Sequence, residues 1–235
     1  MGANQQILSS FEAAAGGVLG TPSLLDTSGN LSASSTHASG SISPSASTLI
    51  IVCATWRSSS ARTLSSLANG GTLTTGSWTI AANFASSSGL EVGHAVAWAT
   101  YTSGSGAVTL TYSGGVSRSA VGIIEITGAD TTTPFINIKT ASEDEAASGT
   151  DASLTLDSTP SAGNMVLGLL GNYRDSAGIT PGTNFTELAD FNSGGGGLVE
   201  CQIQYDLTTL GTTVDWTSIR NNEDRSYSGL ELQVA

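Results

Sequence analysis

Basic residues are scarce in this sequence of 235 residues. Lysine and arginine together number 7, against 19 aspartates and glutamates, and the formal net charge is −12. Proteins that bind nucleic acid neutralise its phosphates with clustered Lys and Arg, and no such cluster occurs here. Anionic membranes attract basic segments for the same reason. The charge therefore predicts that neither nucleic acid nor an anionic membrane is a partner.

Long apolar runs are also missing. No stretch reaches the roughly 18 apolar residues that a membrane-spanning helix needs. Residues 1–17 lack the basic and apolar regions of a secretory signal. Gln6 stands where the myristoylation pattern needs Ser or Thr. We therefore expect no signal peptide, no lipid anchor at the N-terminus and no membrane span.

Two cysteines are too few for a small fold that is stapled by disulfides. Cys53 and Cys201 each sit inside an apolar run, which favours two buried, reduced side chains. A single bridge between them is the alternative. No Cys or His spacing typical of a metal site occurs, so the sequence predicts no metal and no cofactor.

The chain contains an internal repeat. Residues 117–130 (SRSAVGIIEITGAD) contain Arg-Ser, two spacers, Gly and an apolar run, and residues 224–235 (DRSYSGLELQVA) repeat that phrase. Other blocks match in the same order, among them SPSA at 43–46 and TPSA at 159–162. Matching order across several blocks argues against a chance likeness of two Ser/Thr-rich segments. The sequence therefore predicts a duplication.

The duplication sets the predicted organisation of the chain. We expect an N-terminal arm over residues 1–20, a first copy over 21–131 and a second copy over 132–235. Arg118 and Arg225 begin the last strand of each copy in this alignment. We expect them to pair with a carboxylate or a strand carbonyl; a shared ligand-binding role is the alternative.

Alternation of apolar and polar residues predicts strands in both copies. Residues 199–207 place Val, Cys, Ile, Tyr and Leu on one face and charged or amide side chains on the other. Residues 48–56 and 164–173 are continuous apolar runs, typical of central strands covered on both faces. The predicted fold class is all-β, with two tandem duplicated antiparallel β-sandwich units of jelly-roll-like type. Separate units are favoured; a fused pair is the alternative.

No catalytic pattern emerges from the sequence, and we expect a non-enzymatic protein. His94 shares a strand face with apolar residues and is predicted to be buried, whereas His37 lies in a Ser-rich segment and is predicted to be exposed. A glycosidase needs two carboxylates across a sugar. Glu125 and Glu231 align with each other, so we expect equivalent, solvated positions in different copies rather than a facing pair.

The acidic segment at 143–145 is interpreted as a solvated loop. A loose calcium site is the alternative there, and residues 26–30 are a second candidate for such a site, although neither segment has the ligand spacing of a dedicated calcium loop. Near the N-terminus, Ile7, Leu8 and Phe11 share one face of a short predicted helix over 5–15. We expect these three residues to contact a partner protein; a frayed terminus is the alternative.

Tryptophan raises the question of sugar binding, because lectin-like surfaces stack a flat aromatic ring on a sugar. Trp98 and Trp216 lie in strands with a core pattern, and Trp56 ends a buried strand, so we expect all three to pack. Trp78 follows a Gly/Thr turn and is the best candidate for an exposed ring. It is the predicted sugar-stacking residue.

Several of these runs together resemble a β-sandwich module of tailed-bacteriophage virion proteins. The resemblance is carried by STLIIVCATW (47–56), by residues 89–115 and by AVGIIEITGAD (120–130). In the second copy a Pro-Gly turn leads to an aromatic residue and Thr, with Phe185 where Trp is commoner in such modules. The resemblance covers about 21–235.

The resemblance implies a non-enzymatic virion protein on the particle exterior, assembled in the host cytoplasm. Capsid decoration is the main expectation, with head fibres and tail accessory proteins in the same group. Its partners would be other virion proteins, and it would form homo-oligomers. The alternative is a carbohydrate-binding or receptor-binding, lectin-like module that recognises a cell-surface glycan. Head and tail locations both stay open.

Overall fold

The computed structural model describes residues 17–87, 89–144, 151–173, 178–195, 198–219 and 223–235. Within them the chain is all-β, and no helix has the length and apolarity that a membrane crossing requires. The expected helix over 5–15 falls outside the described residues. So do the predicted partner-contact residues Ile7, Leu8 and Phe11.

The first copy folds into two antiparallel sheets. Its larger sheet has the order β1-β9-β3-β7, with β6 and the short β5 both paired to β7, and its smaller sheet has the order β2-β8-β4. The strands are β1 (Ser23–Asn30), β2 (Ser34–Ala38), β3 (Thr48–Arg57), β4 (Leu64–Asn69), β5 (Thr74–Thr75), β6 (Thr79–Phe84), β7 (Val92–Ser103), β8 (Val108–Val116) and β9 (Arg118–Thr127).

The second copy repeats this arrangement. Its larger sheet has the order β10-β17-β12-β15-β14, and its smaller sheet has the order β11-β16-β13. The strands are β10 (Phe135–Glu143), β11 (Ala152–Thr155), β12 (Met165–Tyr173), β13 (Thr180–Pro181), β14 (Thr186–Asn192), β15 (Val199–Asp206), β16 (Thr213–Thr217) and β17 (Arg225–Leu232).

Both copies have the topology of a jelly roll. When the strands of each copy are counted from its start and β5 is left aside, the larger sheets both read 1-8-3-6-5 and the smaller sheets both read 2-7-4. The chain thus crosses repeatedly between two facing sheets, as in jelly rolls, except at the fifth and sixth strands, which pair with each other in the larger sheet. The predicted all-β fold class with two duplicated sandwich units is confirmed.

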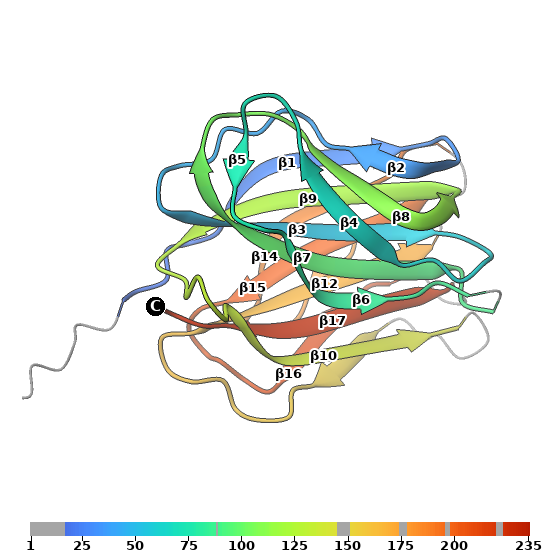
Figure 1. The fold of residues 1–235 in the computed structure, drawn as a ribbon. Coiled ribbons are helices and arrows are strands. Elements are labelled where there is room, and N and C mark those ends of the chain that lie inside the picture. Colours follow the sequence, from blue (N-terminus) through green and yellow to red (C-terminus); the bar gives the residue numbers. More distant parts are fainter. Residues whose placement is uncertain (1–16, 88, 145–150, 174–177, 196–197, 220–222) are drawn as a thin grey trace, which may run out of the picture.

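The two larger sheets pack face to face, so the molecule has four layers. In Figure 1 the first copy, blue to green, lies above the second, yellow to red. The contacts are reciprocal, because each contact recurs with the equivalent strands exchanged between the copies. The third strand of one copy packs on the sixth of the other (β3 on β15, β12 on β7), and the first lies beside the fifth (β1 beside β14, β10 beside β6). This is the pattern of a twofold interface between two like units. The copies are therefore two jelly rolls joined back to back.

The largest apolar core lies between the copies rather than inside either of them. It combines Leu49, Ile51 and Cys53 of β3 with Leu167 and Leu169 of β12 and their neighbours. Smaller cores fill each jelly roll between its own two sheets. The face that each copy turns to the other is apolar, and burial of that face against the partner copy is a major part of its stabilisation.

Glycines allow the two larger sheets to approach closely. A Cβ on Gly122 of β9 would lie 2.6 Å from Cδ1 of Ile203 on β15. In the reciprocal direction, a Cβ on Gly171 of β12 would lie 2.8 Å from Cγ2 of Thr55 on β3. Real Cβ atoms do not sit at such distances, so any larger residue at either position would have to displace the facing side chain.

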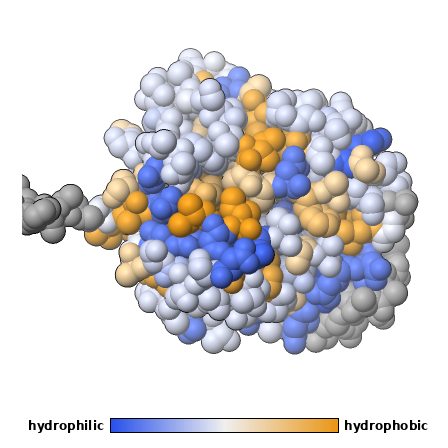
Figure 2. All heavy atoms as spheres, turned by 60° about the horizontal axis from the view of Figure 1, so that its bottom comes forward, coloured by the Kyte–Doolittle hydropathy of each residue, from blue (hydrophilic) through white to orange (hydrophobic). Residues whose placement is uncertain are grey.

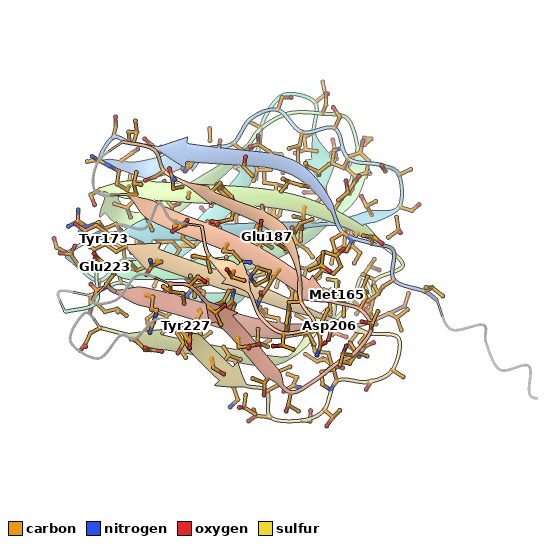
Figure 3. The ribbon with its side chains drawn as sticks, turned by 180° about the vertical axis from the view of Figure 1, so that it is seen from behind. Met165, Tyr173, Glu187, Asp206, Glu223 and Tyr227 are labelled. Atoms are coloured by element: carbon orange, nitrogen blue, oxygen red, sulfur yellow. The ribbon has the colours of Figure 1, made fainter. Side chains whose placement is uncertain are left out.

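Polar contacts also tie the copies together at one end of the stack. The Arg57 guanidinium lies over the Tyr173 ring, 4.0 Å from its centroid. The backbone N–H of Glu91 donates to the Asp224 carboxylate at 2.8 Å. Figure 3 shows Tyr173 near Glu223 at this end, with Met165 and Asp206 at the opposite end. The copies are therefore joined by polar contacts at this end of the strands as well as by apolar packing of their sheet faces.

The first and last described residues lie together. Gly17 N–H donates to the carbonyl of Ala235 at 3.4 Å, and Gly20 N–H donates to Thr127 at 3.0 Å. Leu19, which the sequence placed in the arm, is buried in the core between the copies. The body of the fold thus includes residues 17–20.

Candidate functional site

Trp78 lines a groove on the first copy, of about 420 Å³, between β4 and the segment that leads into β6. The ring is half-buried because it packs against the core of the first jelly roll. Its indole N–H donates to Oδ1 of Asn69 at 2.9 Å, and Nδ2 of Asn69 donates to the Thr75 hydroxyl at 3.0 Å. The ring is therefore held in one orientation before any ligand binds.

The local sequence explains why the ring is held there. Gly76 N–H donates to the carbonyl of Thr100 at 2.8 Å, and a Cβ on Gly76 would lie 2.5 Å from the Thr100 hydroxyl. The glycine thus brings the chain against β7 and turns it, and Trp78 follows two residues later. Sequence reasoning selected Trp78 but missed Asn69, whose Asn-Gly-Gly turn was the available signal.

The rest of the groove is lined mainly by small polar groups. Ser65, Ser66, Thr75 and Ser77 line it together with Trp78. An aromatic ring beside uncharged donors and acceptors suits a ligand with one apolar face and many hydroxyls. A saccharide has both features, because its axial C–H groups form an apolar face and its hydroxyls project from the rim.

The other tryptophans have structural positions. Trp56 and Trp216 are fully buried, as the sequence predicts. The Trp216 indole N–H donates to the buried Gln202 side chain at 2.7 Å. Trp98 is half-buried against the core between the copies, and it lines an apolar cleft of about 210 Å³ with Phe135 of β10. None of the three presents its ring in a polar groove.

One histidine prediction is confirmed and the other is wrong. His94 is fully buried and stacks on Phe84, with ring centroids 5.6 Å apart, and burial lowers its pKa to about 3. His37 was expected to be exposed, but it is only 4% exposed, because β2 turns its ring toward β9. Its ring nitrogens contact the hydroxyls of Ser119 at 2.7 Å and Ser28 at 3.1 Å.

The His37 cluster is unsuited to base catalysis. Burial lowers the His37 pKa to about 4, partly opposed by the charge of Asp26. A general base works best with a pKa near the working pH. Both ring nitrogens already face hydroxyls, and the Asp26 carboxylate accepts the Gly40 N–H at 2.8 Å. The cluster links three strands of the first jelly roll.

Glu125 and Glu231 occupy equivalent positions, as the alignment predicts. Glu125 accepts the backbone N–H of Ser45 at 2.6 Å, and Glu231 accepts the backbone N–H of Ser161 at 2.7 Å. The two carboxylates therefore belong to separate turns and do not face each other. The expectation that both are solvated is wrong for Glu231, which is 2% exposed because Asn164 also donates to it.

Arg118 and Arg225 begin β9 and β17, but they are not equivalent. Trp56 of β3 and Asn172 of β12 are equivalent positions of the two copies. Trp56 pairs with Ser119 of β9, whereas Asn172 pairs with Arg225 of β17. The Arg-Ser phrases are thus shifted by one residue in the fold. Such a shift points the side chain to the opposite face of the sheet.

Each arginine has a structural partner, as expected. Arg225 is fully buried and forms an ion pair with Glu143, whose other oxygen accepts the Tyr227 hydroxyl at 2.8 Å. Arg118 donates to the backbone carbonyl of Ser117 at 2.8 Å. Because the two side chains lie on opposite sheet faces, they do not form a repeated ligand site.

The acidic segments have ordinary roles where they are described. Glu143 was expected in a solvated loop, but it ends β10 and pairs with Arg225. Residues 26–30 lie inside β1 and pair with β9. Glu145, the last residue of the 143–145 cluster, falls outside the described residues. In the described part of the chain, no group of three or more His, Cys, Asp or Glu side chains is arranged to hold a metal ion.

Both cysteines are buried and free, which confirms the first reading of their sequence context. They lie in the core between the copies. Burial raises the pKa of the Cys53 thiol to about 12, and that of Cys201 is also raised, chiefly by burial. They act as small apolar side chains.

No known protein family, curated protein or solved structure matches this chain.

Proposed function

We propose that this chain is a non-enzymatic structural protein of a tailed-bacteriophage virion that decorates the capsid exterior. The observation that carries the proposal is the pair of jelly rolls joined by a shared apolar core. Jelly rolls are used by viral capsid and lectin domains, and this joined pair makes a stiff block without a hinge between copies. The sequence resemblance to virion modules points the same way.

Surface chemistry also supports this proposal. In Figure 2 pale, weakly polar residues cover much of the face, with orange and blue patches between them. Charged residues make up 11% of the chain, and Ser, Thr, Gly and Ala take their place. A surface of this kind keeps a particle soluble without strong attraction to other polyelectrolytes. The partners in this proposal are other virion proteins and further copies of the chain.

Immunogold electron microscopy of purified virus particles tests this function, using antibody to the recombinant protein. Gold over the heads is the expected result. Gold confined to the tail would replace capsid decoration with a tail accessory role. Particles without gold, in a preparation whose major capsid protein does label, would contradict the virion proposal.

A second candidate function is recognition of a cell-surface glycan, and the Trp78 groove is the observation that favours it. The ring is pre-oriented by Asn69 in a groove lined by serine and threonine residues, so little ordering is needed on binding. Trp78→Ala should abolish binding of the full chain at this groove. Trp78→Phe should retain part of it, because a smaller ring still stacks. Phe84→Leu, which alters an aromatic outside the groove, is the control.

A hydrolase is the third candidate function. Glu125 and Glu231 are the carboxylate pair that the alignment places at equivalent positions of the two copies. Because each of these carboxylates holds a turn, we propose that neither is catalytic. Turnover of a glycan by the purified protein, lost on Glu125→Gln or Glu231→Gln with the fold intact, would contradict the non-enzymatic assignment.

A further inference from the structure

The second copy has an aromatic residue at the position that Trp78 holds in the first. Trp78 immediately precedes β6, and Phe185 immediately precedes β14. These strands are the fifth of each jelly roll and pair with equivalent neighbours, β7 and β15. Phe84 pairs with His94, and Phe191 pairs with Cys201, the residue equivalent to His94. The strands β6 and β14 are therefore aligned without a shift. The duplication therefore places one aromatic at the same point of each copy.

Phe185 also lines a groove, of about 350 Å³. The groove lies between the turn that precedes β14 and the segment that leads into β16. Phe185 is half-buried against the core of the second jelly roll. The polar residues around the ring include Thr183, Asn184, Thr212, Thr213 and Asp215.

Buried side chains hold the walls of this groove in place. Gln204 is fully buried; its side-chain oxygen accepts the Gly182 N–H at 2.9 Å, and its amide donates to the carbonyl of Asp215 at 2.9 Å. The turn closes through Phe185 N–H, which donates to Gly182 at 3.0 Å. On the other wall, the buried Asp206 carboxylate accepts three successive backbone N–H groups, of residues 208–210.

Backbone strain gathers at the same place. Asn184, which lines the groove, has φ of 70°, and Leu210, beside its rim, has φ of 48°. Non-glycine residues in this region cost energy and persist where the surroundings impose them, often at binding sites.

Asp215 supplies a hydrogen-bond acceptor to the groove. Its carboxylate lies against Cα of Gly182, where any Cβ would clash with it, so the glycine makes room for the carboxylate. None of the described residues donates a hydrogen bond to this carboxylate. A half-exposed carboxylate beside an aromatic ring is well placed to accept hydrogen bonds from the hydroxyls of a ligand.

We propose that the Phe185 groove is a second saccharide-binding site, specific for neutral sugars. The sugar stacks on Phe185 and donates its hydroxyls to Asp215. Acidic sugars are disfavoured because Asp206 and Asp215 lie together in the groove and repel a further negative charge. The proposal rests on the glycan-binding function given above as the second candidate, and it extends that function to two unlike sites.

The two sites lie on opposite sides of the molecule. β6 and β14 are each at an edge of a larger sheet, but β6 lies beside β10 whereas β14 lies beside β1, at the other edge of the stack. Figure 3 shows Asp206 at the Met165 end of the second copy, away from Tyr173 and Glu223. One chain can therefore engage two glycan chains at once, which raises its avidity for a dense surface.

The test begins with the full chain on an array of neutral and uronic-acid-containing oligosaccharides, followed by calorimetry with the neutral oligosaccharide that binds best. We expect two sites per chain. Phe185→Ala and Trp78→Ala should each remove one site, and the double variant should remove both. Asp215→Asn should weaken the second site by about tenfold, because a charged acceptor is lost. Phe84→Leu is the control.

The variant Phe185→Trp distinguishes a role of Phe185 in sugar binding from a role in folding alone. A larger ring at this position should tighten the second site, whereas a merely structural role predicts no gain. If Trp78→Ala removes all binding, or the second site prefers uronic acids, the inference is overturned and the Trp78 site stands. If no oligosaccharide binds the folded wild-type chain, both glycan sites are overturned, and the virion proposal is judged by microscopy alone.

Discussion

The core shared by the copies predicts that the chain unfolds as one unit. Ile203 on β15 is fully buried in that core and belongs to the second copy, but its Cδ1 approaches Gly122 of the first. Ile203→Ala should cost about 2–5 kcal/mol, because it removes buried methyl and methylene groups and leaves a cavity. This is a large part of the roughly 5–15 kcal/mol that stabilises a typical domain. The loss should fall on both copies.

Native-state hydrogen exchange measures the two copies separately. The amides of β3 report on the first copy, and those of β12 report on the second, since each is the central strand of its sheet. In the wild type we expect both sets to exchange through the same global opening. Ile203→Ala should lower both opening free energies by the same amount. If β12 is destabilised and β3 is not, the copies fold independently and the reasoning is refuted.

A second variant tests the contact itself. Gly122→Ala should cost about 1–3 kcal/mol, because its Cβ would meet Cδ1 of Ile203 at 2.6 Å. Ile203→Val removes that carbon, so the glycine substitution should cost less in the valine background. A double-mutant cycle gives the coupling, expected at about 0.5 kcal/mol or more. Additive effects would show that the contact with Cδ1 of Ile203 is not the source of the cost of Gly122→Ala.

Three further predictions concern buried ionisable groups. Burial raises the pKa of both thiols, that of Cys53 to about 12, so a thiol reagent at pH 8 should label neither in the native protein and both after unfolding. Burial lowers the pKa of both histidines, to about 4 and 3, below the unfolded value of 6.5. The unfolded state therefore binds more protons between about pH 6.5 and 4, and stability should fall as the pH drops through this window. His94→Cys, the residue at that position in the second copy, should flatten the slope of urea midpoint against pH; an unchanged slope would contradict burial of a neutral imidazole. Arg225→Ala leaves Glu143 without its buried partner and should cost about 3–5 kcal/mol in urea unfolding, against about 1 kcal/mol for Arg118→Ala, which loses a carbonyl hydrogen bond. Equal losses would contradict the difference in their surroundings.

The two candidate grooves show how far sequence reasoning reaches. Trp78 could be selected because it follows a Gly/Thr turn outside the alternating pattern, and Phe185 stands out in the second copy's aromatic-Thr turn. Asn69 carried a local signal, its Asn-Gly-Gly turn, but the hydrogen bond by which it orients Trp78 is not part of that signal. Asp215 could not be selected, because it comes from a different strand segment and reaches its groove only when the sheets assemble. Side-chain partners distant in the chain leave no local pattern.

His37 and the two arginines illustrate the same limit. A Ser-rich neighbourhood indicated an exposed His37, but pairing of β2 with β8 turns that ring into the fold. Matching letters placed Arg118 and Arg225 together, whereas the ladders place them one residue apart and on opposite faces. In a strand, a shift of one residue reverses the side that a residue faces, and a short sequence match cannot resolve it.

By itself, the sequence determined the all-β class, the strand positions and the repetition of the fold, because alternation, turn residues and repeated blocks are local signals. It also determined that both cysteines are buried, since each lies in an apolar run. Only the tertiary structure decided that the two jelly rolls share their largest core and that each aromatic has a polar groove. Those features depend on which apolar face meets which, and a two-sided apolar strand such as β3 is equally compatible with a partner sheet in its own copy or in the other.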